Sequence, residues 1–192
     1  MDITKWLKTG AVIGAIVLTP AISMAARVQS CVAGPATPES YTWDFSREAT
    51  GLLNDMRYDA QRVAHHATNL EDFAMNSDID WQFHADQLTK IKREVDDMGK
   101  RLCRLEVIEG AVAPWQQAAI NQMAPVVQLM ADNTDDAINY MNAHQGEFWV
   151  RSYRMNVQNL DTEASTVARK VHRDEERGGL TPHEMSYSGS GS

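Results

Sequence analysis

Two histidines and a methionine are the residues of this sequence whose types and spacing could bind a metal ion or a haem. His84 and His144 both fall on the apolar faces of predicted helices, and Met141 lies one helical turn before His144. Imidazole nitrogens and thioether sulfurs are ligands that suit haem iron and copper. However, the sequence contains no Cys-x-x-Cys-His motif for covalent haem and no Glu-x-x-His pair of the di-iron kind. We therefore favour the alternative that these histidines cap the end of a helical bundle.

The other patterns that could carry chemistry are weaker. Ten methionines could indicate Cu(I) binding, but those in predicted helices stand singly at apolar positions, where methionine is an ordinary core residue. His65 and His66 are adjacent, so their rings diverge by ~100° on a helix. The acidic run 132–136 lacks the glycine and the distal glutamate of an EF-hand. No nucleophile elbow, phosphate-binding glycine loop or His-Glu-x-x-His motif occurs, and we expect no enzymatic activity.

Four long amphipathic helices are predicted to position these side chains. In the segment 81–109, apolar residues recur at alternating steps of three and four with charged residues between them, which indicates one buried stripe. Pro125 lies inside one of the predicted helices, where we expect a kink or a restart. Three further segments carry the same pattern, namely 42–76 with Thr42 or Asp44 as its cap, 113–144 opened by Ala113-Pro114, and 146–177.

Short connections between these segments favour neighbours that run in opposite directions. We therefore expect an all-α fold, an antiparallel up-down-up-down four-helix bundle with long helices, over residues 42–177. Alignment of the four stripes from the loops places His84 in one layer with Leu70, Met141 and Tyr153. Thr134 is expected to face inward in another layer.

The segments outside the predicted bundle indicate export. Residues 1–25 combine a basic start, an apolar run and small residues before a predicted cleavage site after Ala25, which is typical of a signal peptide. We expect a periplasmic or secreted protein. The alternatives are an uncleaved segment that anchors the protein in a membrane, or lipidation at Cys31. Residues 26–41 are expected to form an extended linker and 178–192 a disordered tail, whose Gly/Ser end (186–192) is either disordered or an artificial extension.

The two cysteines and the net charge bear on partners. In an exported protein, Cys31 and Cys103 are predicted to form a disulfide that fixes the N-terminal tail to the second helix. The alternative is a half-buried Cys103 with Cys31 free or lipidated. The net charge of −8 repels phosphate backbones and anionic lipid, so we do not expect nucleic acid as a partner.

One stretch resembles a known group. Pro114-Trp115-Gln116-Gln117-Ala118-Ala119-Ile120, with Met98-Gly99-Lys100 before it and Ala137-Ile138 after it, resembles exported bacterial all-helical, four-helix-bundle proteins. The resemblance covers roughly residues 80–160. It implies an all-α exported protein and implies no activity, cofactor or site residue.

Two functional hypotheses follow. The first is a non-enzymatic exported bundle that acts through its surface as a binding or envelope-associated accessory protein with an unknown protein partner. Trp43, Trp115 and Phe148-Trp149 lie near helix ends, where they could anchor a partner or plug the bundle. The second is a haem- or copper-binding bundle for electron transfer or metal handling that uses His84, His144 and Met141.

Overall fold

The structure is a computed structural model that describes residues 44–76, 80–145 and 147–178. These residues form four long α-helices and one short 3-10 helix, with no strand among them. The predicted all-helical, four-helix fold is confirmed. The helices are α1 (Phe45–Ala74), α2 (Trp81–Ile108), α3 (Pro114–Ala143) and α4 (Arg151–Gly178), and the 3-10 helix is η2 (Glu109–Ala111).

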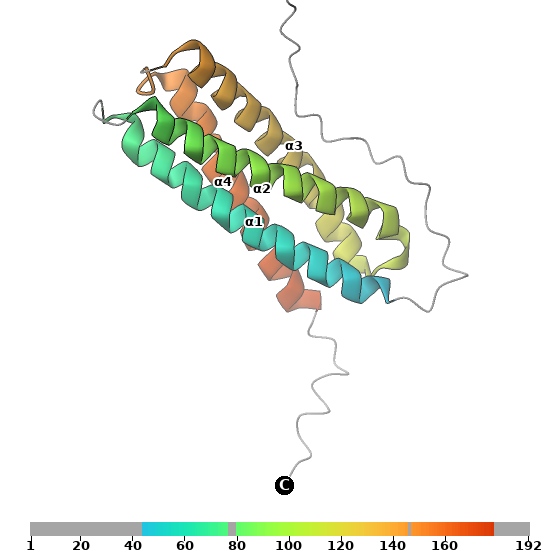
Figure 1. The fold of residues 1–192 in the computed structure, drawn as a ribbon. Coiled ribbons are helices and arrows are strands. Elements are labelled where there is room, and N and C mark those ends of the chain that lie inside the picture. The colour runs from blue at the N-terminus through green and yellow to red at the C-terminus, as the bar shows by residue number, and fades with distance from the viewer. Residues whose placement is uncertain (1–43, 77–79, 146, 179–192) are drawn as a thin grey trace, which may run out of the picture.

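The four helices pack around a common core (Figure 1). Helix α1 lies against α2 and α4, and α3 lies against the same two helices, whereas α1 and α3 hardly meet. Each helix therefore has two packed neighbours. The apolar stripe that the sequence shows on each segment faces this shared interior.

Two polar contacts show how α1 lies along α2. Near the start of α1, Glu48 Oε1 is 2.6 Å from Arg104 Nε, close to the end of α2. Near the other end of α1, His66 Nδ1 is 2.8 Å from Gln87 Oε1, close to the start of α2. The partners of successive α1 residues therefore come from successively earlier positions in α2.

Capping residues explain where the helices begin. Asp44 Oδ1 accepts a hydrogen bond from the Arg47 N–H at 3.0 Å, which satisfies one of the free donors at the start of α1. Asp80 caps α2 in the same way. Pro114 is the first residue of α3, where its missing N–H costs nothing. The other predicted cap, Thr42, lies outside the described residues.

Two predicted helix bounds are wrong, and one of the two alternatives predicted at Pro125 does not occur. Helix α4 begins at Arg151 rather than at 146. Helix α3 is continuous through Pro125, so the predicted restart does not occur, and the alternative of a kink stays a prediction. Pro125 is exposed, and water can solvate the carbonyl that loses its helical partner. Gly178, which we expected to begin the tail, is the last residue of α4.

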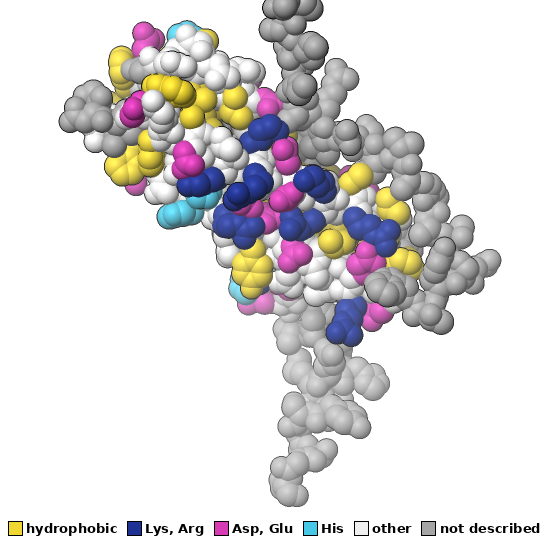
Figure 2. Space-filling view, in the orientation of Figure 1, with side chains coloured by type: hydrophobic (Ala, Val, Ile, Leu, Met, Phe, Trp, Pro, Cys, Tyr) yellow, Lys and Arg dark blue, Asp and Glu magenta, His cyan; other side chains and the backbone are white. Residues whose placement is uncertain are grey.

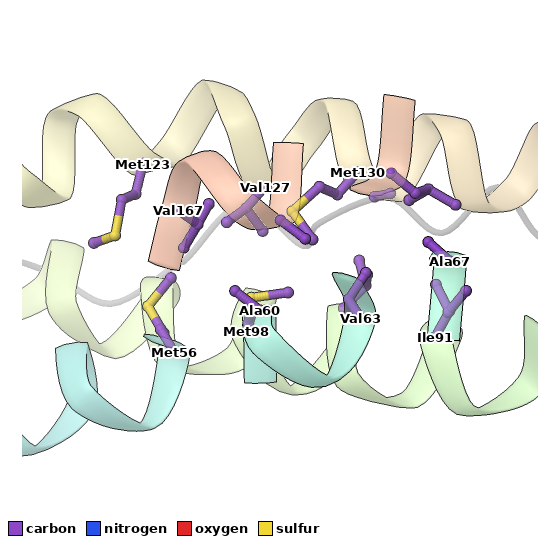
Figure 3. Packing of buried hydrophobic residues seen from close by; sticks show 14 of the residues in the cluster. Met56, Ala60, Val63, Ala67, Ile91, Met98, Met123, Val127, Met130 and Val167 are labelled. Atoms are coloured by element: carbon purple, nitrogen blue, oxygen red, sulfur yellow. The ribbon is translucent and has the colours of Figure 1, made fainter. Parts of the chain in front are cut away.

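The core consists of the predicted stripes. The stripe methionines Met56, Met98, Met123, Met130 and Met141 are at most 7% exposed, which confirms their assignment to the core. Figure 3 shows methionine thioethers directed between the helices, among valine and alanine side chains. Thr134 is 2% exposed as predicted, and its hydroxyl donates to the Met130 carbonyl oxygen at 2.6 Å.

In the part of the chain that the structure describes, no helix has the length and apolar character needed to cross a membrane. The predicted export signal (1–25), linker (26–41) and remaining tail (179–192) lie outside the described residues. The predictions for these three segments therefore stay predictions.

Candidate functional site

Aromatic side chains gather at one end of the bundle, which we call the aromatic end. Contacts between rings bring together the last turns of α1 and α3, the first turns of α2 and α4, and the loop between α3 and α4. Neighbouring ring centroids are 3.8–5.8 Å apart. The rings are Phe73, Phe83, His84, Phe148, Tyr153, Tyr140 and His144. Such offset and edge-on ring contacts stiffen the end of the bundle.

His84 lies at the centre of this cluster. It is 1% exposed, its Nδ1 atom is 2.9 Å from the Tyr153 hydroxyl, and its ring stacks on Phe148 at 3.8 Å. Burial away from water lowers the pKa of His84 to about 4, because the charged imidazolium loses its hydration. The contact with Tyr153 confirms that these two members of the predicted layer lie side by side.

Tyr153 completes this pair. Its side chain is fully buried, and burial raises the pKa of its phenol above the usual value. Both partners are therefore uncharged near neutral pH and shielded from solvent. The pair forms a buried hydrogen bond that joins α2 to α4.

His144 and Met141, the other two predicted metal ligands, have surroundings that differ from those of His84. Helix α3 ends at Ala143, and His144 leaves the helical path with φ −137° and ψ 58°. Its side chain is exposed and stacks on Tyr140 at 4.4 Å, so the expectation that it continues the inward stripe is wrong. Met141 is buried at 7% exposure. Among the described residues, no three His, Cys, Asp or Glu side chains are grouped so that they could hold a metal ion.

The predicted aromatic anchors divide between the interior and the surface. Phe148 is 4% exposed and plugs the aromatic end, whereas the adjacent Trp149 is 51% exposed. Trp115 is partly buried against the core. Trp43 lies outside the described residues. Of the anchors that the structure places, Trp149 is therefore the one whose side chain a partner could reach.

Other exposed apolar residues lie on or next to the helix ends that form the aromatic end. Figure 2 shows hydrophobic side chains gathered over this end of the molecule. Of this exposed set, Trp149 is one of the anchors predicted from the sequence, whereas the other four residues are not predicted to lie on the surface. The members of the set are Phe73 (37% exposed), Met75 (66%), Trp81 (38%), Trp149 (51%) and Met155 (46%). We call these five residues the apolar surface.

A network of charged side chains, which we call the charged seam, lies between α1 and α2. Asp59 and Glu94 are 1% and 3% exposed, although both are carboxylates. Arg62 bridges them, since its Nη2 atom pairs with Asp59 and lies 2.7 Å from Glu94 Oε2. Arg101 pairs with Asp59, and Arg93 lies 2.9 Å from Glu94 Oε1. Figure 2 shows basic and acidic side chains alternating across this part of the surface.

The pKa values of the two carboxyls move in opposite directions. Burial raises the pKa of Asp59 against the opposing charges of Arg101 and Arg62. Burial also acts on Glu94, but hydrogen bonds and charges from Arg62 and Arg93 outweigh it and lower the pKa. Both carboxylates are occupied by guanidinium groups of the chain itself. The charged seam therefore fastens α1 to α2 and offers no free acid or base.

Cys103 is half-buried on α2. Cys31 lies outside the described residues. The predicted Cys31–Cys103 disulfide therefore stays a prediction.

No protein-family model, curated protein or solved structure matches this chain. The resemblance of residues 80–160 to exported bacterial helical proteins stays a prediction. The functional argument therefore rests on the geometry of the aromatic end and of the charged seam.

Proposed function

We propose that this protein is a non-enzymatic, exported binding protein that presents the apolar surface at its aromatic end to a protein partner. The observation that carries the proposal is the concentration of Phe73, Met75, Trp81, Trp149 and Met155 at one end of the bundle. Scattered apolar residues are normal on a protein surface, but a gathered group of aromatic and methionine side chains is typical of interaction sites.

The buried rings below this surface support the proposal. Phe148 packs against both His84 and Tyr153, with ring centroids 3.8 Å and 5.2 Å away. Because Trp149 follows Phe148 directly, the plug fixes the backbone that carries the exposed indole. A preorganised aromatic side chain loses less conformational entropy on binding, so such a position favours affinity.

The proposed scaffold is an antiparallel up-down-up-down bundle. Two contacts support opposite directions for α1 and α2, namely Glu48 with Arg104 and His66 with Gln87. For α3 and α4, Asn133 Nδ2 is 3.0 Å from Glu163 Oε1, and Lys170 Nζ is 3.2 Å from Gln122 Oε1. In this arrangement the connection between α3 and α4, which carries Trp149, lies at the same end of the bundle as Phe73, Met75 and Trp81.

The proposal of export, to the periplasm or the outside of the cell, rests on the signal-like pattern of residues 1–25. The acidic net charge of −8 favours a protein partner over nucleic acid or an anionic membrane. We infer an accessory role in which binding, rather than catalysis, is the activity.

Site-specific photo-crosslinking in the native cells tests the proposal. A photoreactive phenylalanine analogue replaces Trp149 or Trp81 in the apolar surface. The matched controls place it at Tyr58 on α1 or Leu129 on α3, which are 52% and 51% exposed but belong to other parts of the surface. We expect the same discrete adduct from both positions of the apolar surface and none from the controls. Equal adducts from all four positions, or none from Trp149 and Trp81, would contradict the proposed function.

A further inference from the structure

A groove on the outer side of α4 lies at the edge of the apolar surface. Its volume is about 530 Å³, and it begins at the loop that carries Trp149. Trp149 and Met155 supply apolar walls, and each is about half exposed at 51% and 46%. Arg151, Arg154, Gln158 and Asn159 supply the polar part of the lining.

The charge of this groove differs from that of the whole protein. Arg151 is exposed and takes part in no ion pair with another described residue. Arg154 has Glu71 as its nearest carboxylate, with Nη2 and Oε1 4.0 Å apart, which is the outer limit of an ion pair. The Arg154 Nε atom is shielded from water and has no hydrogen-bond acceptor among the described residues. In a chain of net charge −8, Arg151 and Arg154 with the single carboxylate of Glu71 beside them therefore leave the groove with a net positive charge.

The start of α4 adds to this potential. The first turn of α4 contains no acidic residue. Free N–H groups at the start of a helix favour a nearby anion. The arginines at the start of α4 do not supply one. The charge of the groove and the direction of the helix thus both favour a negatively charged occupant.

We propose that this groove binds a segment of a partner protein in which acidic residues alternate with large apolar ones. The proposal deepens the proposed function and rests on it. A carboxylate of the segment would accept hydrogen bonds from the Arg151 and Arg154 guanidinium groups. An apolar side chain next to it would pack against the Trp149 indole and the Met155 thioether. The charge complementarity of groove and segment selects this class of partner.

Glu71 provides an internal check on this chemistry. Its carboxylate accepts a hydrogen bond from Gln158 and lies beside Arg154, so it competes with an incoming carboxylate. Removal of this competitor is expected to strengthen binding. A site that recognised only apolar surface would not respond to the charge at residue 71.

The test uses the full-length protein and the synthetic peptide acetyl-Glu-Phe-Glu-Leu-Glu-amide, with an analogue in which glutamine replaces each glutamate. Binding is followed by nuclear magnetic resonance at the indole N–H of Trp149, which the loss of one signal in Trp149→Phe identifies. We expect a saturable shift of this signal and at least about ten-fold weaker binding of the glutamine analogue.

Four variants separate the proposed site from general charge effects. Arg151→Gln and Arg154→Gln should each weaken binding of the acidic peptide about three-fold, and Glu71→Gln should strengthen it by a similar factor. Arg173→Gln is the matched control, because it removes the same charge from an exposed position near the far end of α4. It should leave binding unchanged.

The results that would overturn the inference are equally specific. Equal affinity for both peptides, or equal weakening by Arg173→Gln and Arg151→Gln, would show that the groove does not select an acidic segment. A Trp149 shift with phosphatidylglycerol vesicles and none with the peptide would assign the groove to a lipid surface instead. If the peptide fails while crosslinking at Trp149 still captures a protein, this inference fails and the proposed function stands. Loss of crosslinking at Trp149 and Trp81 would contradict the proposed function itself.

Discussion

The Nδ1 atom of His84 lies 2.9 Å from the hydroxyl oxygen of Tyr153, and both side chains are excluded from solvent. This hydrogen bond joins α2 to α4, two helices that are not among the closely packed pairs of the bundle. It therefore crosses the interior rather than a seam between neighbours. A polar pair in such a place satisfies itself, and the loss of either partner leaves the other buried without one.

A double-mutant cycle measures this bond. His84→Phe and Tyr153→Phe should each lower the free energy of unfolding by ~1–3 kcal/mol, because each leaves one buried polar group without a partner. The double variant should lose less than the sum of the two, since it leaves neither group unsatisfied. Urea denaturation of the four proteins gives the coupling free energy. Strictly additive losses would show that the contact contributes nothing of its own.

The lowered pKa of His84 predicts how stability depends on pH. The folded-state pKa is about 4, whereas an unfolded histidine titrates near 6.5. Below pH ~6.5 the unfolded chain binds a proton that folded His84 does not take up until about pH 4, so this histidine contributes stability above that window and loses it as the pH falls. The loss attributable to His84 amounts to at most ~3 kcal/mol.

The measurement compares unfolding free energies of the wild type and His84→Phe at pH 7.5 and pH 4.5. Other groups also titrate in this range, and burial lowers the pKa of His66 in the same direction. Their contributions cancel in the difference between the two proteins. The wild type should lose more stability on acidification than the variant does. Parallel losses would mean that His84 titrates normally in the folded protein.

The buried core can be predicted from the sequence more readily than the candidate site, and particular residues show why. The period of the apolar stripes places Met98 and Thr134 inside, and the loop positions place His84 beside Tyr153. These are properties of single helices and their connections. The choice between Phe148 as plug and Trp149 as exposed side chain is different, because it depends on the direction of a short loop that has no period.

The charged seam escapes sequence analysis for another reason. Glu94 stands among charged residues in the pattern of its own helix, which normally indicates exposure. Its burial depends on Arg62, which comes from another helix. The sequence shows that Asp59 and Arg62 lie about one helical turn apart on α1. This spacing does not reveal that Arg62 also pairs with Glu94, which depends on the packing of α1 against α2.

The charged seam predicts unequal effects for two neighbouring basic residues. Arg101 is 27% exposed and pairs with the buried Asp59 on α1, whereas Lys100 is 74% exposed and pairs with Asp97 on its own helix. Arg101→Met should lower the free energy of unfolding by ~1–3 kcal/mol, because the Asp59 carboxylate loses a compensating charge. Lys100→Met should change little, since exposed pairs within a helix contribute weakly. Chemical denaturation of both variants measures these changes. Equal losses of unfolding free energy would show that the Arg101 pair of the charged seam contributes no more than an exposed ion pair within one helix.

Two glycines of the helices predict opposite responses to alanine. Gly51 is exposed on α1, and a Cβ atom there would meet nothing within 4 Å. Gly51→Ala should therefore raise the free energy of unfolding by ~0.5–1 kcal/mol through helix propensity. At Gly178, a Cβ atom would overlap the indole of Trp115, which packs on the end of α4.

Gly178→Ala should accordingly give no gain and should destabilise the protein, because Trp115 must leave its position against the core. The loss should be smaller in a Trp115→Ala background, where the obstructing ring is gone. Thermal denaturation of the single and double variants measures both effects, and near-ultraviolet circular dichroism reports the environment of the tryptophans. An equal rise in stability for Gly178→Ala and Gly51→Ala would show that Trp115 does not seal this end of the bundle.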